Sequence, residues 1–345
     1  MKFACYSDWD QLPGSANTLF EQGEKDSLFY SRPWFENLAT ALDADESMLL
    51  ACVQDGNMLL AMLPLIKSSG KNYVSLKHRY TTHYSLLLAD PGTDQQSQQI
   101  LTCLAEGLKQ LPLRSLLLEP VAADDSRVVG LQDSMEAAGY QCESMFRTYN
   151  WIYRVQGQSY KEYMAARPAR LRNTIARKQR KLEREHGYDI RLYTGNEVPQ
   201  AMPDYYAVYT ASWKANEQFV EFLDGIVAGF SRPGWSRLAV LYVEGKPVAA
   251  QLWFVLRGKA SIFRLSYDEA WKQYSPGSIL TSFLMEYVID TDKVREIDFL
   301  TGNDTYKQDW MSERRERVAL SCVNTEKPAG KVKRFVASMK RMLTS

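Results

Sequence analysis

Residues 266–280 read SYDEAWKQYSPGSIL, and this segment decides the fold. Ser275 is a good N-cap residue, and Pro276 suits the first position of a helix. The apolar residues that follow recur at helical spacing, at Ile279, Leu280, Phe283, Leu284, Tyr287 and Val288. The segment therefore predicts a turn followed by a helix over 276–290 that buries one face.

The first turn of this helix is a candidate anion site. Gly277 and Ser278 are small, so a ligand can approach the backbone N–H groups, where the positive end of the helix dipole favours negative charge. Lys272 adds a positive charge nearby. Ordinary helices also begin with Ser-Pro-Gly, so the motif alone is weak. Its position after three predicted strands at 238–243, 248–256 and 260–267 favours a pyrophosphate site.

The rest of the chain shows a similar order of elements in both halves. In the first half we expect helices at 31–42, 95–110 and 130–138, and strands at 48–53, 58–66, 82–88, 114–119 and 146–155. The Asp55-Gly56 pair indicates a hairpin between the first two strands. In the second half we expect helices at 159–185 and 199–215, strands at 189–193, 296–300 and 317–324, and a short helix after the turn at 302–304.

These patterns predict an α/β (α+β) protein of two lobes, residues 1–157 and 158–345. Each lobe should have its own mixed, mostly antiparallel sheet flanked by helices, and the two lobes should pack side by side. We interpret the shared element order as an ancient duplication, although the residues themselves do not repeat.

Composition limits the class of protein. The 345 residues suffice for two domains, and 45% apolar and 24% charged residues are typical of a globular protein. Lys and Arg number 42 against 41 Asp and Glu, so net charge gives no argument for nucleic acid. Five scattered cysteines and three histidines indicate isolated reduced thiols and no metal centre. With no signal peptide and no long apolar run, we expect a cytoplasmic protein without a transmembrane segment.

Residues 167–184 form a strongly basic helical stretch. The cations are Arg167, Arg170, Arg172, Arg177, Lys178, Arg180, Lys181 and Arg184, and Glu183 is the only acid among them. Either this is a solvated helix face or it binds a polyanion, such as the phosphates of CoA, a tRNA or an anionic lipid. Arg172 and Arg177 could instead face inward. A second basic stretch, 331–343, could contact an anionic membrane, but a surface helix packed on its own domain is favoured.

Residues 159–324 resemble the GNAT-fold acyltransferases of the CelD type. These are relatives of the FemAB transferases, and some are associated with cellulose or other exopolysaccharide synthesis. The resemblance rests on the three-strand meander, the turn Tyr274-x-Pro276-Gly277-x-x-Leu280 and the run Asp298-Phe299-Leu300-x-Gly302-x-Asp304-x-Tyr306-Lys307-x-x-Trp310. The first lobe shares only the element order, so we interpret it as a degenerate GNAT-like copy.

The resemblance implies an acyl-CoA donor, with acetyl-CoA first, and no metal. The acceptor would be an amine or hydroxyl of a polar cell-envelope or polysaccharide precursor, whether a small molecule, a saccharide or a peptide. Two alternatives remain open: an aminoacyl-tRNA donor, as in Fem proteins, and a non-catalytic accessory role in polysaccharide synthesis. The cofactor residues would be Lys272, Tyr274, Ser275, Gly277 and Ser278.

The candidate catalytic residues are Asp304, Tyr306, Lys307 and Arg264. In GNAT enzymes the acid is often a tyrosine after the fifth strand, and Tyr306 follows the strand at 296–300. Asp304 is the nearest carboxylate able to act as a base, and Lys307 could bind an acidic acceptor or the oxyanion.

Structural roles remain possible for the same residues. Arg264, expected on the strand face of Ile262 and Ser266, either points into the cleft or packs. Asp304 could cap the short helix, and Tyr306 could fill space under Trp310.

Overall fold

The computed structural model describes residues 1–42, 47–90, 92–214 and 217–325. The first lobe contains β1 Lys2–Tyr6, α1 Ala16–Asp26, α2 Arg32–Ala41, β2 Met48–Asp55, β3 Met58–Ser69, β4 Asn72–Ser75, β5 Leu87–Leu88, α3 Asp94–Gln110, β6 Ser115–Ala122, α4 Ser126–Ala137 and β7 Tyr140–Arg154. The second lobe contains α5 Tyr160–Ala165, α6 Ala169–Glu185, β8 Asp189–Thr194, α7 Val198–Thr210, α8 Val220–Ser231, β9 Ser236–Val243, β10 Lys246–Leu256, β11 Lys259–Tyr267, α9 Pro276–Glu286, β12 Glu296–Thr301, α10 Lys307–Trp310 and β13 Glu313–Asn324.

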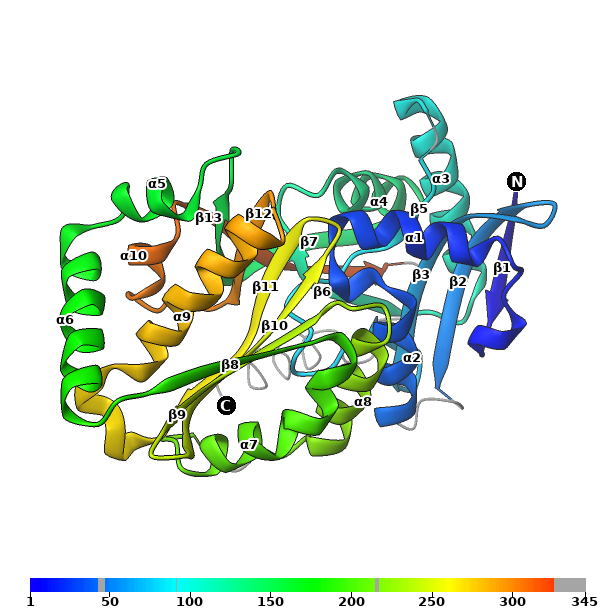
Figure 1. Ribbon diagram of the computed structural model, residues 1–345. Coiled ribbons are helices and arrows are strands. Elements are labelled where there is room, and N and C mark those ends of the chain that lie inside the picture. Colours follow the sequence, from blue (N-terminus) through cyan, green and yellow to red (C-terminus); the bar gives the residue numbers. More distant parts are fainter. Residues whose placement is uncertain (43–46, 91, 215–216, 326–345) are drawn as a thin grey trace.

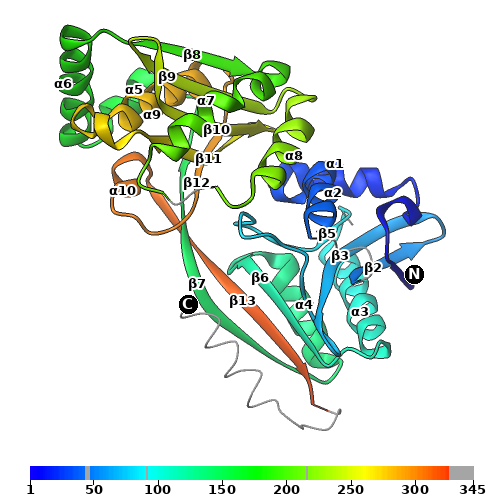
Figure 2. The ribbon, with the colours of Figure 1, turned by 90° about the horizontal axis from the view of Figure 1, so that it is seen from below.

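One continuous sheet runs through both lobes, in the order β1-β2-β3-β4-β6-β13-β7-β12-β11-β10-β9-β8. The predicted mixed α/β class with helices on a large mixed sheet is confirmed, but the expectation of two separate sheets is corrected. The reason is the length of two strands. At about 3.3 Å per residue, the 15 residues of β7 span roughly 50 Å, so β7 can pair with β13 and also reach β12. Figure 2 shows β7 and β13 side by side, joining the lobes.

The final strand is exchanged between the lobes. β13 comes from the C-terminal end of the chain, yet it lies between β6 and β7, while β7 lies between β13 and β12. This pairing places Cys142 opposite Cys322, with their sulfur atoms 2.6 Å apart. The interpretation of all five thiols as isolated is therefore corrected, because the sequence separation of 180 residues hides a cross-strand pair.

Helices cover both faces of the second-lobe sheet (Figure 1). α7 packs on β10 from one side and α9 from the other, and α6 packs on α9. The lobes also share a core, because Trp34 of α2 is fully buried against Phe222 and Phe230 of α8. Asn37 of α2 donates to the Phe222 carbonyl (3.0 Å), which fixes the same contact. We expect this interface to hold the two lobes in a fixed relation.

The predicted helix 31–42, the hairpin, the helix 95–110 and the meander are confirmed within a few residues. The basic helix 159–185 is two helices, because Pro168 precedes α6 in an extended conformation. The strand expected at 82–88 is limited to β5, and α7 ends at Thr210, before 215. The sequence analysis missed β1, α1, β4 and α8.

Three further expectations concern limits of the chain. The predicted domain boundary at 157–158 falls between β7 and α5. That residues 1–157 and 158–345 are separate domains stays a prediction. The basic stretch 331–343 lies outside the described residues. Among the described residues, none of the helices combines the length and apolar character needed to cross a membrane.

Candidate active site

The sheet opens between β11 and β12. These parallel strands pair only where residues 259–261 face residues 296–298. Beyond that point β12 is deformed, because Leu300 and Gly302 have φ of 55° and 115° and the register with β7 shifts between Asp298 and Thr301. β11 carries a bulge opposite Leu252 and Trp253. The two strands therefore separate, and their facing edges lack a neighbouring strand.

A cavity of about 800 Å³ occupies this opening, and we call it the donor cleft. Its walls come from β11, the end of β12, the start of α9, α6, the segment 213–214, and residues 79–82 of the first lobe. Six of the predicted site residues line it: Arg264, Gly277, Ser278, Asp304, Tyr306 and Lys307. We call residues 272–278 the donor turn. The structure thus brings the end of the donor turn and the candidate catalytic residues to one cavity.

The start of α9 differs in detail from the prediction. Ser275 occupies the N-cap position with φ of 51°, but its side chain makes no capping hydrogen bond. The Ser278 N–H donates to the Ser275 carbonyl at 3.0 Å, and Pro276 has no N–H. A Cβ atom at Gly277 would lie 3.2 Å from the Tyr267 ring. Gly277 therefore packs closely on the Tyr267 ring at the cleft wall, and among the described residues its N–H has no backbone acceptor in this turn, unlike that of Ser278.

Lys272, Tyr274 and Ser275 do not line the cleft. The Lys272 ammonium lies 3.6 Å from Glu269 and is largely exposed. Tyr274 is buried, and its hydroxyl donates to Glu185 (3.0 Å). Tyr274 thus holds the turn against α6, and the sequence could not distinguish this role from ligand contact.

A buried ammonium group, that of Lys307 in α10, lies at the end of β12. Lys307 is 4% exposed, and its Nζ donates to the carbonyls of Thr301 (2.5 Å) and Phe299 (3.2 Å). Asp304 lies 3.7 Å away and is mostly exposed. Burial lowers the pKa of Lys307, although the Asp304 carboxylate opposes that shift. The alternative in which Asp304 caps the short helix is wrong, because α10 has Tyr306 at its N-cap position.

Tyr306 presents a hydroxyl that is a weak acid. Its ring packs edge-on against Phe299, with centroids 5.8 Å apart, and 43% of the residue is exposed. Burial, followed by the Asp304 carboxylate, raises the pKa of Tyr306 to about 12. The phenol is thus protonated at neutral pH and able to donate a proton in the cleft.

Arg264 forms a charged cluster on the opposite wall. Its guanidinium lies 2.9 Å from Glu217 and 3.6 Å above the Tyr80 ring. Because of the bulge at Phe263, Arg264 lies beside Phe263, which packs against the core that the two lobes share. Ile262 packs in a second core on the other face of β11, so the expectation that Arg264 and Ile262 share a face is wrong. Arg264 both packs and lines the cleft.

The sequence analysis missed Lys214. Its Nζ donates to the Leu265 carbonyl, and burial, together with the nearby Arg264 charge, lowers the pKa of Lys214 to about 8. Lys214 also lines the donor cleft. Glu217 lies only three residues further along the chain, but Leu265 and Arg264 come from β11, about 50 residues away, so no local pattern marks this cluster.

Residues 169–308 match the family model described as "Acetyltransferase (GNAT) domain". The match covers α6, the meander, the donor turn and the beginning of α10. This part of the chain is therefore similar to a GNAT acetyltransferase domain, which indicates an acyltransferase, and the acceptor is not identified.

The whole chain shares its fold with tandem-GNAT structures. FemX has 8% identity and a TM-score of 0.65, covering 92% of this chain and 98% of its own. L-PGS from Bacillus licheniformis has 12% identity and a TM-score of 0.54, covering 90% and 95%. A tandem GNAT protein from the clavulanic acid biosynthesis pathway has 12% identity and a TM-score of 0.50, covering 92% and 97%. A comparison with curated proteins gives no sequence match.

Proposed function

We propose that the protein is an acyl-CoA-dependent N- or O-acyltransferase, with acetyl-CoA as the first donor to test. The proposed acceptor is a polar precursor of the cell envelope or of an exopolysaccharide. The observation that carries the proposal is the donor cleft, in which the start of α9 and the end of β12 face the same cavity. We further propose a cytoplasmic location, which the described free thiols support.

In the proposed complex, Gly277 and Ser278 lie beside the pyrophosphate at the positive end of α9. The acyl-bearing arm then extends along the edge of β11 that faces β12, which among the described residues has no strand partner beyond residue 261, while the other edge stays paired with β10. This arrangement would place the thioester near the end of β12, because β11 and β12 are adjacent where they diverge.

The proposed reaction needs one proton removed and one supplied. The acceptor nitrogen or oxygen attacks the thioester carbonyl, and its proton passes to a base, for which Asp304 is the candidate. The tetrahedral intermediate collapses, the C–S bond breaks, and the thiolate takes a proton from Tyr306. The cleft also holds the Lys307 ammonium beside Thr301, where it can stabilise negative charge.

A thermal shift screen with acetyl-CoA, longer acyl-CoAs and tRNA tests the donor. A ligand at 100 times its Kd stabilises the folded state by about 2.7 kcal/mol, so the true donor should raise the Tm with the logarithm of its concentration. We expect the response from an acyl-CoA. A response to aminoacyl-tRNA alone would contradict the proposal.

The aminoacyl-tRNA alternative is kept because of α6. Arg172, Arg177 and Arg180 are exposed and available to a polyanion. The possibility that Arg172 and Arg177 face inward is thereby excluded. By contrast, Lys178 and Lys181 contact Gln273 of the donor turn. The basic helix therefore has two sets of cations with different surroundings.

A further inference from the structure

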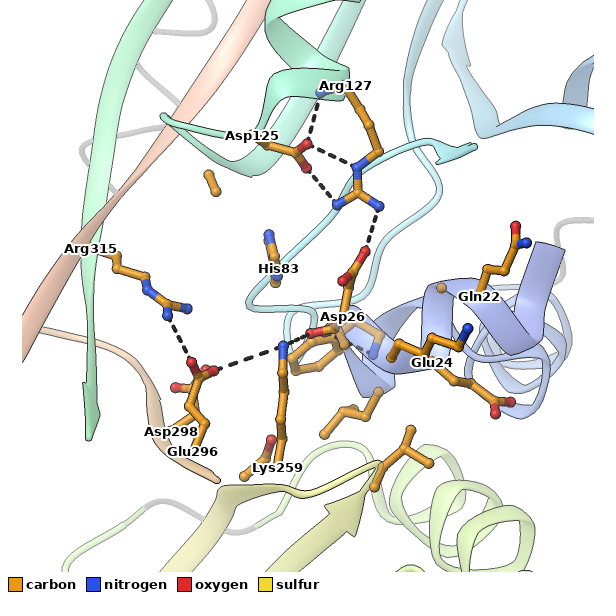
Figure 3. Close-up of a pocket in the computed structure, with 18 of the residues that line it drawn as sticks. Gln22, Glu24, Asp26, His83, Asp125, Arg127, Lys259, Glu296, Asp298 and Arg315 are labelled. Atoms are coloured by element: carbon orange, nitrogen blue, oxygen red, sulfur yellow. Dashed lines mark hydrogen bonds and ion pairs between the residues drawn. The ribbon is translucent and has the colours of Figure 1, made fainter. Parts of the chain in front are cut away.

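A second cavity, of about 700 Å³, lies between the lobes, and we call it the interlobe cavity. The first lobe contributes α1 residues 22–26 and parts of the segments 82–90 and 122–127. The second lobe contributes residues of β11 and β12, and β13 contributes Arg315 and Arg317. Figure 3 shows these side chains converging from both lobes.

The interlobe cavity adjoins the donor cleft. Thr82 and Leu300 line both cavities. Leu300 is the residue with φ of 55° at which β12 departs from regular pairing. A molecule in the interlobe cavity would thus reach the point where β11 and β12 separate, next to the proposed thioester position.

Most charges in the cavity wall already have partners. Arg127 lies 2.9 Å from both Asp125 and Asp26. Glu296 lies 2.8 Å from Arg315 and 4.0 Å from Lys259, as Figure 3 shows. These groups form closed ion pairs, so they offer little to a further ligand.

Arg317 is the exception among these cations, because it forms no ion pair among the described residues, although the buried Asp298 carboxylate of the same wall stabilises its charge. It is 2% exposed, and its Nη2 donates to Asn150 (3.0 Å). Its Nε and Nη1 have no hydrogen-bond partner among the described residues, and neither does the buried Nε2 of His83. Burial, followed by the charge of Arg317, lowers the pKa of His83 well below its usual range, so this ring is neutral. A buried guanidinium with idle N–H groups calls for an acceptor, preferably an anion.

We propose that the interlobe cavity binds the acyl acceptor and that Arg317 binds an anionic group of that acceptor, a carboxylate or a phosphate. The inference rests on the proposed acyltransferase function, because it assigns the second substrate of the same reaction. A guanidinium suits both groups, since its planar N–H donors match the spacing of their oxygen atoms. The acceptor would enter between the lobes and meet the donor at Thr82 and Leu300.

Inorganic phosphate and acetate, titrated into the full chain at constant ionic strength, test this site. Thermal shift gives the apparent Kd for each anion with wild type, Arg317→Gln and Arg154→Gln. Arg154 lines the same cavity but is exposed and paired with Glu313, so it is the matched control. We expect saturable binding of at least one anion, weakened about tenfold or more by Arg317→Gln and unchanged by Arg154→Gln. Phosphate or acetate as the better probe distinguishes the two classes of acceptor.

CoA binding is the second measurement, and it separates the anion site from the donor site. Arg317→Gln should leave CoA affinity unchanged, whereas Gly277→Asp should abolish CoA binding and leave anion binding at Arg317 unchanged. If wild type binds the anion but does not bind CoA, the proposed function is overturned and the anion site is not. If Arg317→Gln does not fold, Arg317→Lys keeps the charge and should weaken anion binding, and a phosphate-soaked crystal should show the anion at Nε or Nη1. Binding insensitive to both Arg317 variants, or no saturable binding, overturns the inference.

Discussion

The two lobes contain the same opening in their sheets, but only the second lobe leaves it empty. In the first lobe β4 pairs in parallel with β6 over residues 72–74 and 115–117, just as β11 pairs with β12 over three residues in the second. Beyond these short ladders the strands separate in both lobes. The second lobe keeps a cavity of about 800 Å³ at that place.

The first lobe fills its opening with its own chain, residues 76–88, which we call the plug. The Tyr84 N–H donates to the Pro120 carbonyl of β6 (2.7 Å), and its hydroxyl donates to the Pro64 carbonyl of β3. Leu76 and Tyr84 are at most 1% exposed. The Pro120 carbonyl of β6 therefore already has a hydrogen-bond donor from the plug.

The helices that follow the two openings, α3 and α9, also differ in how well their first turns would bind an anion. α9 begins with Pro-Gly-Ser, whereas α3 begins after Thr93 with Asp94, a negative charge in the first turn. An acid there satisfies the helix dipole and repels a phosphate. The comparison shows that the two lobes differ at the same place in their sheets, one filled and one open, and it supports the proposal that the donor binds at α9 of the second lobe.

The largest expected effect is on catalysis in the open lobe. Tyr306→Phe removes the proposed proton donor and keeps the ring against Phe299, so the single-turnover rate should fall about 10²-fold or more while acyl-CoA affinity is retained. Tyr267→Phe is the matched control, since Tyr267 lines the same cleft and packs on Trp213. Equal rates in both variants would show that Tyr306 only packs.

Donor binding should distinguish the two helix starts directly. Gly277→Asp puts a carboxylate near the Tyr267 ring, where the phosphates are expected, so CoA affinity measured by calorimetry should fall at least about 100-fold. The helix should survive, because an acid is tolerated in a first turn. Gln95→Asp adds the same charge at the start of α3 and should change nothing. If CoA still binds to Gly277→Asp, the site lies elsewhere.

The donor cleft also holds a lysine whose burial costs stability. Because the pKa of Lys214 is lowered from 10.5 to about 8, the folded state binds fewer protons than the unfolded state between these values. The destabilisation is complete below pH 8 and disappears as the pH rises to 10.5, so stability increases with pH in this window. Wild type should gain at most about 3 kcal/mol over Lys214→Met, measured by urea unfolding. A flat difference would place this ammonium in water.

The sequence predicted those features that local chemistry determines. Asp55-Gly56 gave the hairpin correctly, and the turn at Pro276 was located to the residue. Three features depend on pairing between segments that are distant in the chain: the opening, the plug and the exchanged strand. Such pairing, for example that of Cys142 with Cys322, leaves no periodic pattern in the local sequence. The split of the basic helix was within reach, because a proline inside a helical pattern ends it, and Pro168 stands there. Lys214 and Arg317 required the fold, since their significance lies in burial.

Within the plug, Tyr84 should contribute stability and not donor affinity, in contrast to Arg79, Tyr80 and Thr82, which line the donor cleft. Tyr84→Phe removes the hydroxyl that donates to Pro64 and leaves a buried carbonyl without this donor, so unfolding free energy should fall by about 1–3 kcal/mol. CoA affinity should be unchanged, because Tyr84 does not line the donor cleft. Weaker CoA binding together with unchanged stability would mean that the first lobe also takes part in donor binding.

The smallest expected effect concerns the exposed cations of α6. Arg172, Arg177 and Arg180 make few contacts with the rest of the protein, so replacing all three by Gln should shift the Tm by no more than about 2 °C. CoA affinity should also remain, because none of them lines the donor cleft. Lys178→Gln with Lys181→Gln is the matched pair, and it should raise the Kd for CoA severalfold, because these lysines hold Gln273 beside the turn. If the helix serves a tRNA, the triple variant should reduce the slope of log Kd against log salt by about two to three. An unchanged slope would assign the exposed charges to solvation alone and leave α6 as the support of the donor turn.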